Sequence, residues 1–81
     1  MMETKEILNK LTPIFRQVFN DEEMDVSLEL SSDEIDEWSS LSQAIMLTEV
    51  ENAFNIKFKL REVATMNSVK AIVDLITAKL N

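Results

Sequence analysis

Apolar residues in three segments of this chain recur at the spacing of one face of an α-helix. In residues 3–20, 40–54 and 69–80 they follow the i, i+3, i+4, i+7 pattern of an amphipathic helix. Residues 55–61 alternate apolar and polar types, which taken alone indicates a β-strand. No second strand is available to pair with it, and a lone strand leaves its backbone unsatisfied. The spacing therefore predicts an all-α fold.

The size and composition of the chain predict one small domain, residues 1–81. The chain has 81 residues, of which 46% are hydrophobic, and no cysteine. A domain of this length without disulfides builds a single core. We expect a small bundle of four helices, namely the three segments above and a short helix over residues 62–66, with Asn67 or Ser68 capping the last. A long acidic loop, residues 21–38, joins the first two helices.

Pro13 interrupts the first predicted helix. An interior proline removes one backbone hydrogen bond and clashes with the preceding turn, so a kink near residues 10–12 is expected. Alternatively, Thr12 caps a fresh helix that begins at Pro13, where a missing N–H costs nothing.

Acidic residues dominate the middle of the chain, and the net charge is −7. No Lys or Arg lies between Gln17 and Ile56. A field of one sign repels nucleic acid and anionic membranes and steers toward basic protein surfaces, although an acidic loop that only keeps the protein soluble explains it equally well. We expect no nucleic-acid binding. The carboxylates are Asp21, Glu22, Glu23, Asp25, Glu29, Asp33, Glu34, Asp36, Glu37, Glu49 and Glu51.

The residue types that catalysis and metal binding need are scarce. Histidine and cysteine are absent, and no serine has an adjacent base in triad order. The stretch from Asp21 begins like an EF-hand loop, but Val26 and Ser32 stand where that loop needs glycine and glutamate. No segment approaches the roughly 18 apolar residues of a membrane helix, and no secretory leader is visible. We expect a soluble, cytoplasmic, monomeric protein that is neither an enzyme nor a metal protein.

Three serines, Ser39, Ser40 and Ser42, stand at the start of the second predicted helix. Ser39 or Ser40 is a good N-cap, and Gln43 is placed to close a capping box with Ser40. A phosphate ester on Ser40 would face unpaired N–H groups and the positive end of the helix dipole. Two interpretations of Ser40 therefore remain, an ordinary capping residue and an attachment point for an anionic group.

The second predicted helix carries large apolar residues on two faces. Leu41 and Ile45 lie one turn apart on the face opposite the core, together with Thr48 and Asn52. Single exposed apolar residues are normal, but a patch beside a helix N-terminus indicates a contact surface. The predicted core face carries Met46, Leu47, Val50, Ala53 and Phe54.

Residues 38–58 read WSSLSQAIMLTEVENAFNIKF and resemble the second-helix region of acyl carrier proteins, whose signature is Asp-Ser-Leu at the helix start. Residues 61–76, REVATMNSVKAIVDLI, resemble the short third helix and the fourth helix of that family. Residues 7–21, ILNKLTPIFRQVFND, resemble its first helix. The resemblance covers nearly the whole chain and implies the four-helix bundle of acyl carrier proteins.

In that family the serine before the leucine carries a 4'-phosphopantetheine arm through a phosphodiester, and the thiol of the arm holds an acyl group as a thioester. The resemblance implies that Ser40 is the attachment site, flanked by Ser39 and Leu41. It implies a free-standing acyl carrier protein for a specialised fatty acid, lipid or polyketide-type pathway. A separate phosphopantetheinyl transferase would add the arm, and partner enzymes would transfer and modify the acyl group.

The resemblance also implies a docking face and a place where the arm or acyl chain rests. Leu41 and Ile45 would form the apolar part of the docking face and Glu49 and Glu51 its charged part, matching basic docking surfaces on partners. The arm or chain would contact two residues of the short helix that are also common in cores, Val63 and Met66.

The sequence departs from the family pattern at the motif itself. Ser39 stands where the family has Asp, so the cap is kept and its charge is lost. Ile45, Asn52 and Ala53 stand where carboxylates are usual, which indicates partners different from those of housekeeping fatty acid synthesis. Two alternatives stay open: a peptidyl or aminoacyl carrier of a nonribosomal pathway, and a helical interaction module of the same fold that is never modified.

Overall fold

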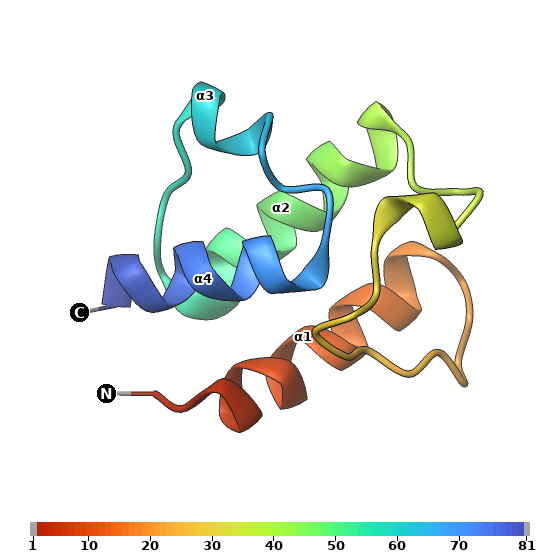
Figure 1. Ribbon diagram of the computed structural model, residues 1–81, viewed down its shortest axis with the longest axis horizontal. Coiled ribbons are helices and arrows are strands. Elements are labelled where there is room, and N and C mark those ends of the chain that lie inside the picture. The colour runs from red at the N-terminus through yellow and green to blue at the C-terminus, as the bar shows by residue number, and fades with distance from the viewer. Residues whose placement is uncertain (1, 81) are drawn as a thin grey trace.

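The computed structural model describes residues 2–80, which fold into a bundle of three longer α-helices and one short one (Figure 1). The α-helices are α1 (Thr4–Val18), α2 (Ser40–Phe54), α3 (Leu60–Val63) and α4 (Val69–Leu80). A 3-10 helix, η1 (Ser32–Glu34), lies in the connection between α1 and α2. The first helix packs against both α2 and α4. The all-α prediction and the boundaries of the second helix are confirmed.

Helix α1 is continuous through Pro13. It begins after Glu3, whose backbone N–H donates to the Glu6 carboxylate at 3.1 Å in a capping box. The alternative in which a fresh helix begins at Pro13 is wrong, because the residues before it are helical. Asn9, whose carbonyl would normally bond to the N–H at position 13, is exposed, and so is Pro13. The bond that proline removes therefore lies on the solvent side of the helix, where water can replace it.

The core lies where the inner faces of α1, α2 and α4 meet. Loop residues add to it: the Trp38 ring packs against Phe15 and Phe19 with centroid distances of 5.6 and 5.7 Å. Ala53, which the pattern assigned to the core, is exposed at the edge of the buried face. The buried residues are Ile7, Leu11, Phe15, Phe19, Ile35, Trp38, Met46, Leu47, Val50, Phe54, Met66, Val69, Ile72, Val73 and Ile76.

The long acidic connection between α1 and α2 is tied to the start of α4. The Ser32 N–H donates to the Asn67 carbonyl and the Val69 N–H donates to the Leu30 carbonyl, both at 2.9 Å. These bonds flank an isolated bridge between Ser31 and Ser68. The connection therefore has fixed anchors, and it delivers Trp38 to the core directly before α2 begins.

The short helix α3 begins two residues earlier than the predicted range of 62–66. The Lys59 N–H donates to the Glu62 carboxylate at 2.7 Å, and this capping contact sets the start of the helix. Residues 56–59 form no strand, as predicted, and the Phe58 N–H donates to the Glu51 carboxylate at 2.7 Å instead. Helix α4 begins at Val69, directly after Ser68, whose hydroxyl accepts from the Ala71 N–H. Among the helices within residues 2–80, none is both long and apolar enough to cross a membrane.

Candidate attachment site at the start of the second helix

Ser39, and not Ser40, caps helix α2. The Ser42 N–H donates to the Ser39 hydroxyl at 3.3 Å, and the Ser39 N–H donates to the Ser42 hydroxyl at 2.8 Å. The predicted capping box between Ser40 and Gln43 is therefore wrong. Ser39 has extended backbone angles, φ −111° and ψ 178°, which suit an N-cap, whereas Ser40 is already helical. Ser39 and Ser42 therefore satisfy each other's backbone N–H groups at the start of the helix, and the Gln43 side chain is not needed there.

Ser40 is the first residue of α2, and its side chain is exposed. Within residues 2–80 its hydroxyl forms no hydrogen bond, whereas the hydroxyls of Ser39 and Ser42 are both engaged. The interpretation of Ser40 as an ordinary capping residue is therefore wrong, because Ser39 is the N-cap. The Ser40 oxygen is presented to solvent at the positive end of a 15-residue helix.

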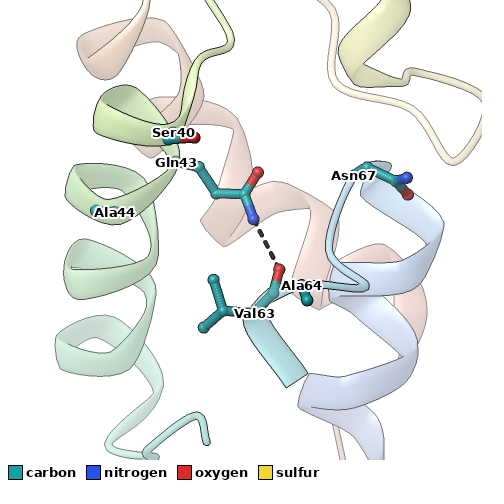
Figure 2. A pocket seen from close by; sticks show the side chains of 6 residues that line it. All are labelled: Ser40, Gln43, Ala44, Val63, Ala64 and Asn67. Atoms are coloured by element: carbon teal, nitrogen blue, oxygen red, sulfur yellow. Dashed lines mark hydrogen bonds between the residues drawn. The ribbon is translucent and has the colours of Figure 1, made fainter. Parts of the chain in front are cut away.

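A pocket of about 310 Å³ lies beside Ser40, between α2 and the α3 segment (Figure 2). Figure 2 shows the Val63 side chain pointing from α3 toward α2. Met66, the other residue expected to contact the arm or chain, is fully buried in the core and does not line this pocket. The six lining residues are Ser40, Gln43, Ala44, Val63, Ala64 and Asn67.

Gln43 spans this pocket, a role that sequence reasoning missed. Its Oε1 accepts from the Trp38 indole Nε1–H at 3.0 Å, and its Nε2 donates to the Val63 carbonyl at 2.8 Å. The second bond joins residues 20 positions apart. No local pattern signals such a contact, because it depends on where the α3 segment lies in space.

The outer face of α2 has the exposure that the sequence predicted. Leu41 is 72% exposed and Ile45 is 50% exposed. Glu49 is partly exposed on the flank of this face. The Glu51 carboxylate is instead used inside the fold, where it accepts from the Phe58 N–H, so the structure does not leave it free on the surface. Sequence reasoning missed Leu60 at the start of α3, which is 89% exposed.

The opposite side of α3 is held by an ion pair to α4. Lys79 Nζ lies 2.9 Å from a Glu62 carboxylate oxygen, and both side chains are mostly covered. The same ammonium lies 5.9 Å from the centroid of the Phe58 ring. The backbone N–H of Lys59 and then the Lys79 ammonium lower the pKa of Glu62, because both stabilise its charged form. Glu62 thus connects the start of α3 to the end of α4.

The described residues thus form a small helical bundle with an exposed hydroxyl at the start of its second long helix. No protein-family model matches the chain, and no curated protein matches it. Among solved structures it is similar to the solution NMR structure of the holo acyl carrier protein from Geobacter metallireducens. The two chains are 40% identical, with a TM-score of 0.82, over 91% of this chain and 85% of that one. The chain belongs to the acyl carrier protein family.

This membership confirms the resemblance inferred from the motif around Ser40 and the four-helix bundle expected from it. An acyl carrier protein is a carrier and not a catalyst, and it works with enzymes of acyl metabolism. The similar structure is that of a holo protein.

Proposed function

We propose that the chain carries acyl groups as thioesters on a 4'-phosphopantetheine arm attached to Ser40. The observation that supports the proposal is that the serines at the start of α2 have different hydrogen bonding. Ser39 and Ser42 close the cap between them, and Ser40 is left with an exposed hydroxyl. A hydroxyl that has no structural task, at a helix N-terminus, suits an anionic linkage.

The surroundings of Ser40 fit a phosphodiester. The Ser42 N–H donates to the Ser39 hydroxyl and the Gln43 N–H donates to the Ser39 carbonyl. The Ser40 and Leu41 N–H groups lie before these donors, in the first turn, where a helix offers them no carbonyl partner. Those two N–H groups and the helix dipole favour a negative charge. Ser39 is a neutral cap, so it adds no carboxylate that would repel the phosphate. A serine in place of the family Asp is therefore compatible with the proposed attachment, and the modification assay below tests whether a transferase accepts it.

The pocket beside Ser40 fits an arm that has both amide and apolar portions. Its lining includes the polar residue Gln43, whose amide points into it in Figure 2, and the apolar residues Ala44, Val63 and Ala64. The phosphopantetheine arm supplies a thiol when it is bound, and the chain has no cysteine of its own. What the chain contributes is the attachment oxygen, an electrostatically favourable helix end and a partly apolar resting place.

The outer face of α2 is the proposed docking surface for partner enzymes. Leu41 and Ile45 offer apolar side chains to solvent, with the Glu49 carboxylate on their flank. The net charge of −7 steers the protein toward basic surfaces, including that of a phosphopantetheinyl transferase. Because the Glu51 carboxylate already accepts from the Phe58 N–H, Glu49 is the carboxylate that this surface offers to a partner. We propose partners of a specialised fatty acid, lipid or polyketide-type pathway.

Intact-protein mass spectrometry tests the attachment. The parent chain is incubated with coenzyme A and a phosphopantetheinyl transferase, beside Ser40→Ala and a matched control, Ser27→Ala, in the exposed loop. The parent and the control should each gain one phosphopantetheine mass, and Ser40→Ala should gain none. A gain in Ser40→Ala would place the arm elsewhere. No gain in the parent with several transferases would favour the unmodified interaction module.

A loading assay separates the acyl carrier from the peptidyl or aminoacyl alternative. The modified protein is offered acyl donors and aminoacyl donors with the corresponding loading enzymes, and the bound thioester is identified by mass. Transfer of acyl groups alone is the expected result. Loading by an aminoacyl donor would reassign the protein to a nonribosomal pathway.

A further inference from the structure

Helix α3 has polar contacts on two sides, in addition to the packing of Val63 against the edge of the core. None of its four residues is buried. On the α2 side, the Val63 carbonyl accepts from Gln43 Nε2 at 2.8 Å, and it also accepts from the Met66 N–H at 3.1 Å. On the α4 side, Glu62 pairs with Lys79. A segment with little buried apolar area has low local stability, so each of these contacts weighs heavily on its position.

The Gln43 amide is fixed in one orientation by its two partners. The Trp38 indole N–H can only donate, and the Val63 carbonyl can only accept, so one placement of the amide oxygen and nitrogen satisfies both. Trp38 itself is 8% exposed and packs edge-on against Phe15. Gln43 therefore joins a buried core residue, Trp38, to the α3 segment across the pocket shown in Figure 2.

We propose that Gln43 is a positioning residue, which holds α3 against α2 and thereby sets the width of the pocket beside Ser40. When the bond from Nε2 to the Val63 carbonyl breaks, α3 pivots on its Glu62–Lys79 contact with α4, and the pocket widens on the α2 side. That the arm lies in this pocket rests on the proposed function. The control of α3 by Gln43 rests on the two hydrogen bonds alone.

Two substitutions distinguish the hydrogen bond from Trp38 to Gln43 from the hydrogen bond from Gln43 to the Val63 carbonyl. Gln43→Leu has an apolar side chain that is one atom shorter, and it removes both bonds. Gln43→Glu keeps an oxygen for the Trp38 indole but has no N–H for the Val63 carbonyl, which its charge also repels. The matched control is Gln17→Leu, because Gln17 is an exposed residue of α1.

Amide hydrogen exchange of the unmodified chain, read by NMR at single residues, tests the proposal. The reporting amides belong to Glu62, Val63, Thr65 and Met66, which are hydrogen-bonded within or directly after α3. Exchange at these amides should accelerate roughly two- to tenfold in Gln43→Leu and Gln43→Glu, the change expected when one partly buried hydrogen bond is lost. The Trp38 indole N–H resonance should shift strongly in Gln43→Leu and little in Gln43→Glu.

Unchanged exchange of α3 in both variants would overturn the proposal. So would an equal acceleration in α1 and α4, because Gln43 would then stabilise the whole fold and not position α3. The measurement needs no arm, so it is independent of Ser40 modification. If the parent gains no phosphopantetheine mass while Gln43→Leu frees α3, the proposed function fails and the positioning role stands. If the parent is modified and α3 is unaffected by Gln43→Leu, the positioning role fails alone.

Discussion

Ser39 and Ser42 exchange two hydrogen bonds at the start of α2, each backbone N–H donating to the other residue's hydroxyl. These bonds satisfy two backbone N–H groups at the start of the helix, and neither involves Ser40, which lies between the two residues in sequence. The Ser40 hydroxyl is consequently exposed at the positive end of the helix. Capping of α2 and the proposed attachment of the arm therefore depend on different serines.

Ser39→Ala should lower the free energy of unfolding by about 1 kcal/mol, because it removes the N-cap acceptor of α2. Urea denaturation followed by circular dichroism measures the change. Ser27→Ala, at an exposed loop position, serves as control and should change stability by less than about 0.5 kcal/mol. A loss in Ser40→Ala as large as that in Ser39→Ala would show that Ser40 shares the capping role.

Ile45→Glu should slow acyl transfer to partner enzymes while leaving the helix content unchanged. Ile45 is 50% exposed on the outer face of α2, so a carboxylate there costs the fold little and disrupts an apolar contact surface. Transfer rates and circular dichroism are measured together. Leu28→Glu, at an exposed loop leucine, is the control. Loss of helix content in Ile45→Glu would mean that this side chain supports the core.

Phe15→Ala should leave the protein largely unfolded at 25 °C. Phe15 is fully buried and packs against the Phe19 and Trp38 rings. Truncation of a core phenylalanine costs about 3–5 kcal/mol, which is comparable with the whole stability of a domain of this size. Circular dichroism and Trp38 fluorescence report the loss. A variant that keeps a cooperative unfolding transition with native helix content would contradict this assignment of the core.

Acidification should remove the contribution of the Glu62–Lys79 pair to stability. The Lys59 N–H and the Lys79 ammonium hold the pKa of Glu62 below its ordinary value of 4.5. A lowered pKa in the folded state means that the stabilisation is present above pH 4.5 and is lost as the pH falls through the lowered pKa. The difference in unfolding free energy between the parent and Lys79→Met should therefore shrink below that pH.

Urea titrations between pH 7 and pH 3 measure this difference. The control is Lys70→Met, which breaks the Lys70–Asp74 pair, because both of those side chains are well exposed and such pairs contribute little. A gap between the parent and Lys79→Met that stays constant over the whole range would show that Lys79 acts through its packing on Phe58, and not through its charge.

The sequence by itself determined the helices and the likeness to acyl carrier proteins. The bounds of α2 and the exposed face with Leu41 and Ile45 were predictable because apolar periodicity is a local property, read within one or two turns. The motif around Ser40 is local as well, so the sequence was enough to predict this residue as the attachment site. Even there, the choice between Ser39 and Ser40 as N-cap needed backbone angles, since both residues are serines and a serine caps well at either position.

Tertiary structure alone decided which polar groups meet across the pocket and which apolar residues line it. Gln43 reaches a carbonyl 20 positions away, Glu51 turns to the Phe58 N–H, and Met66 is fully buried while Val63 lines the pocket. A hydrogen bond requires its two atoms to lie about 3 Å apart, and that separation depends on how the helices and connections pack. Periodicity reports which face of a segment is apolar, but it does not report what that face, or a polar side chain at its edge, will contact.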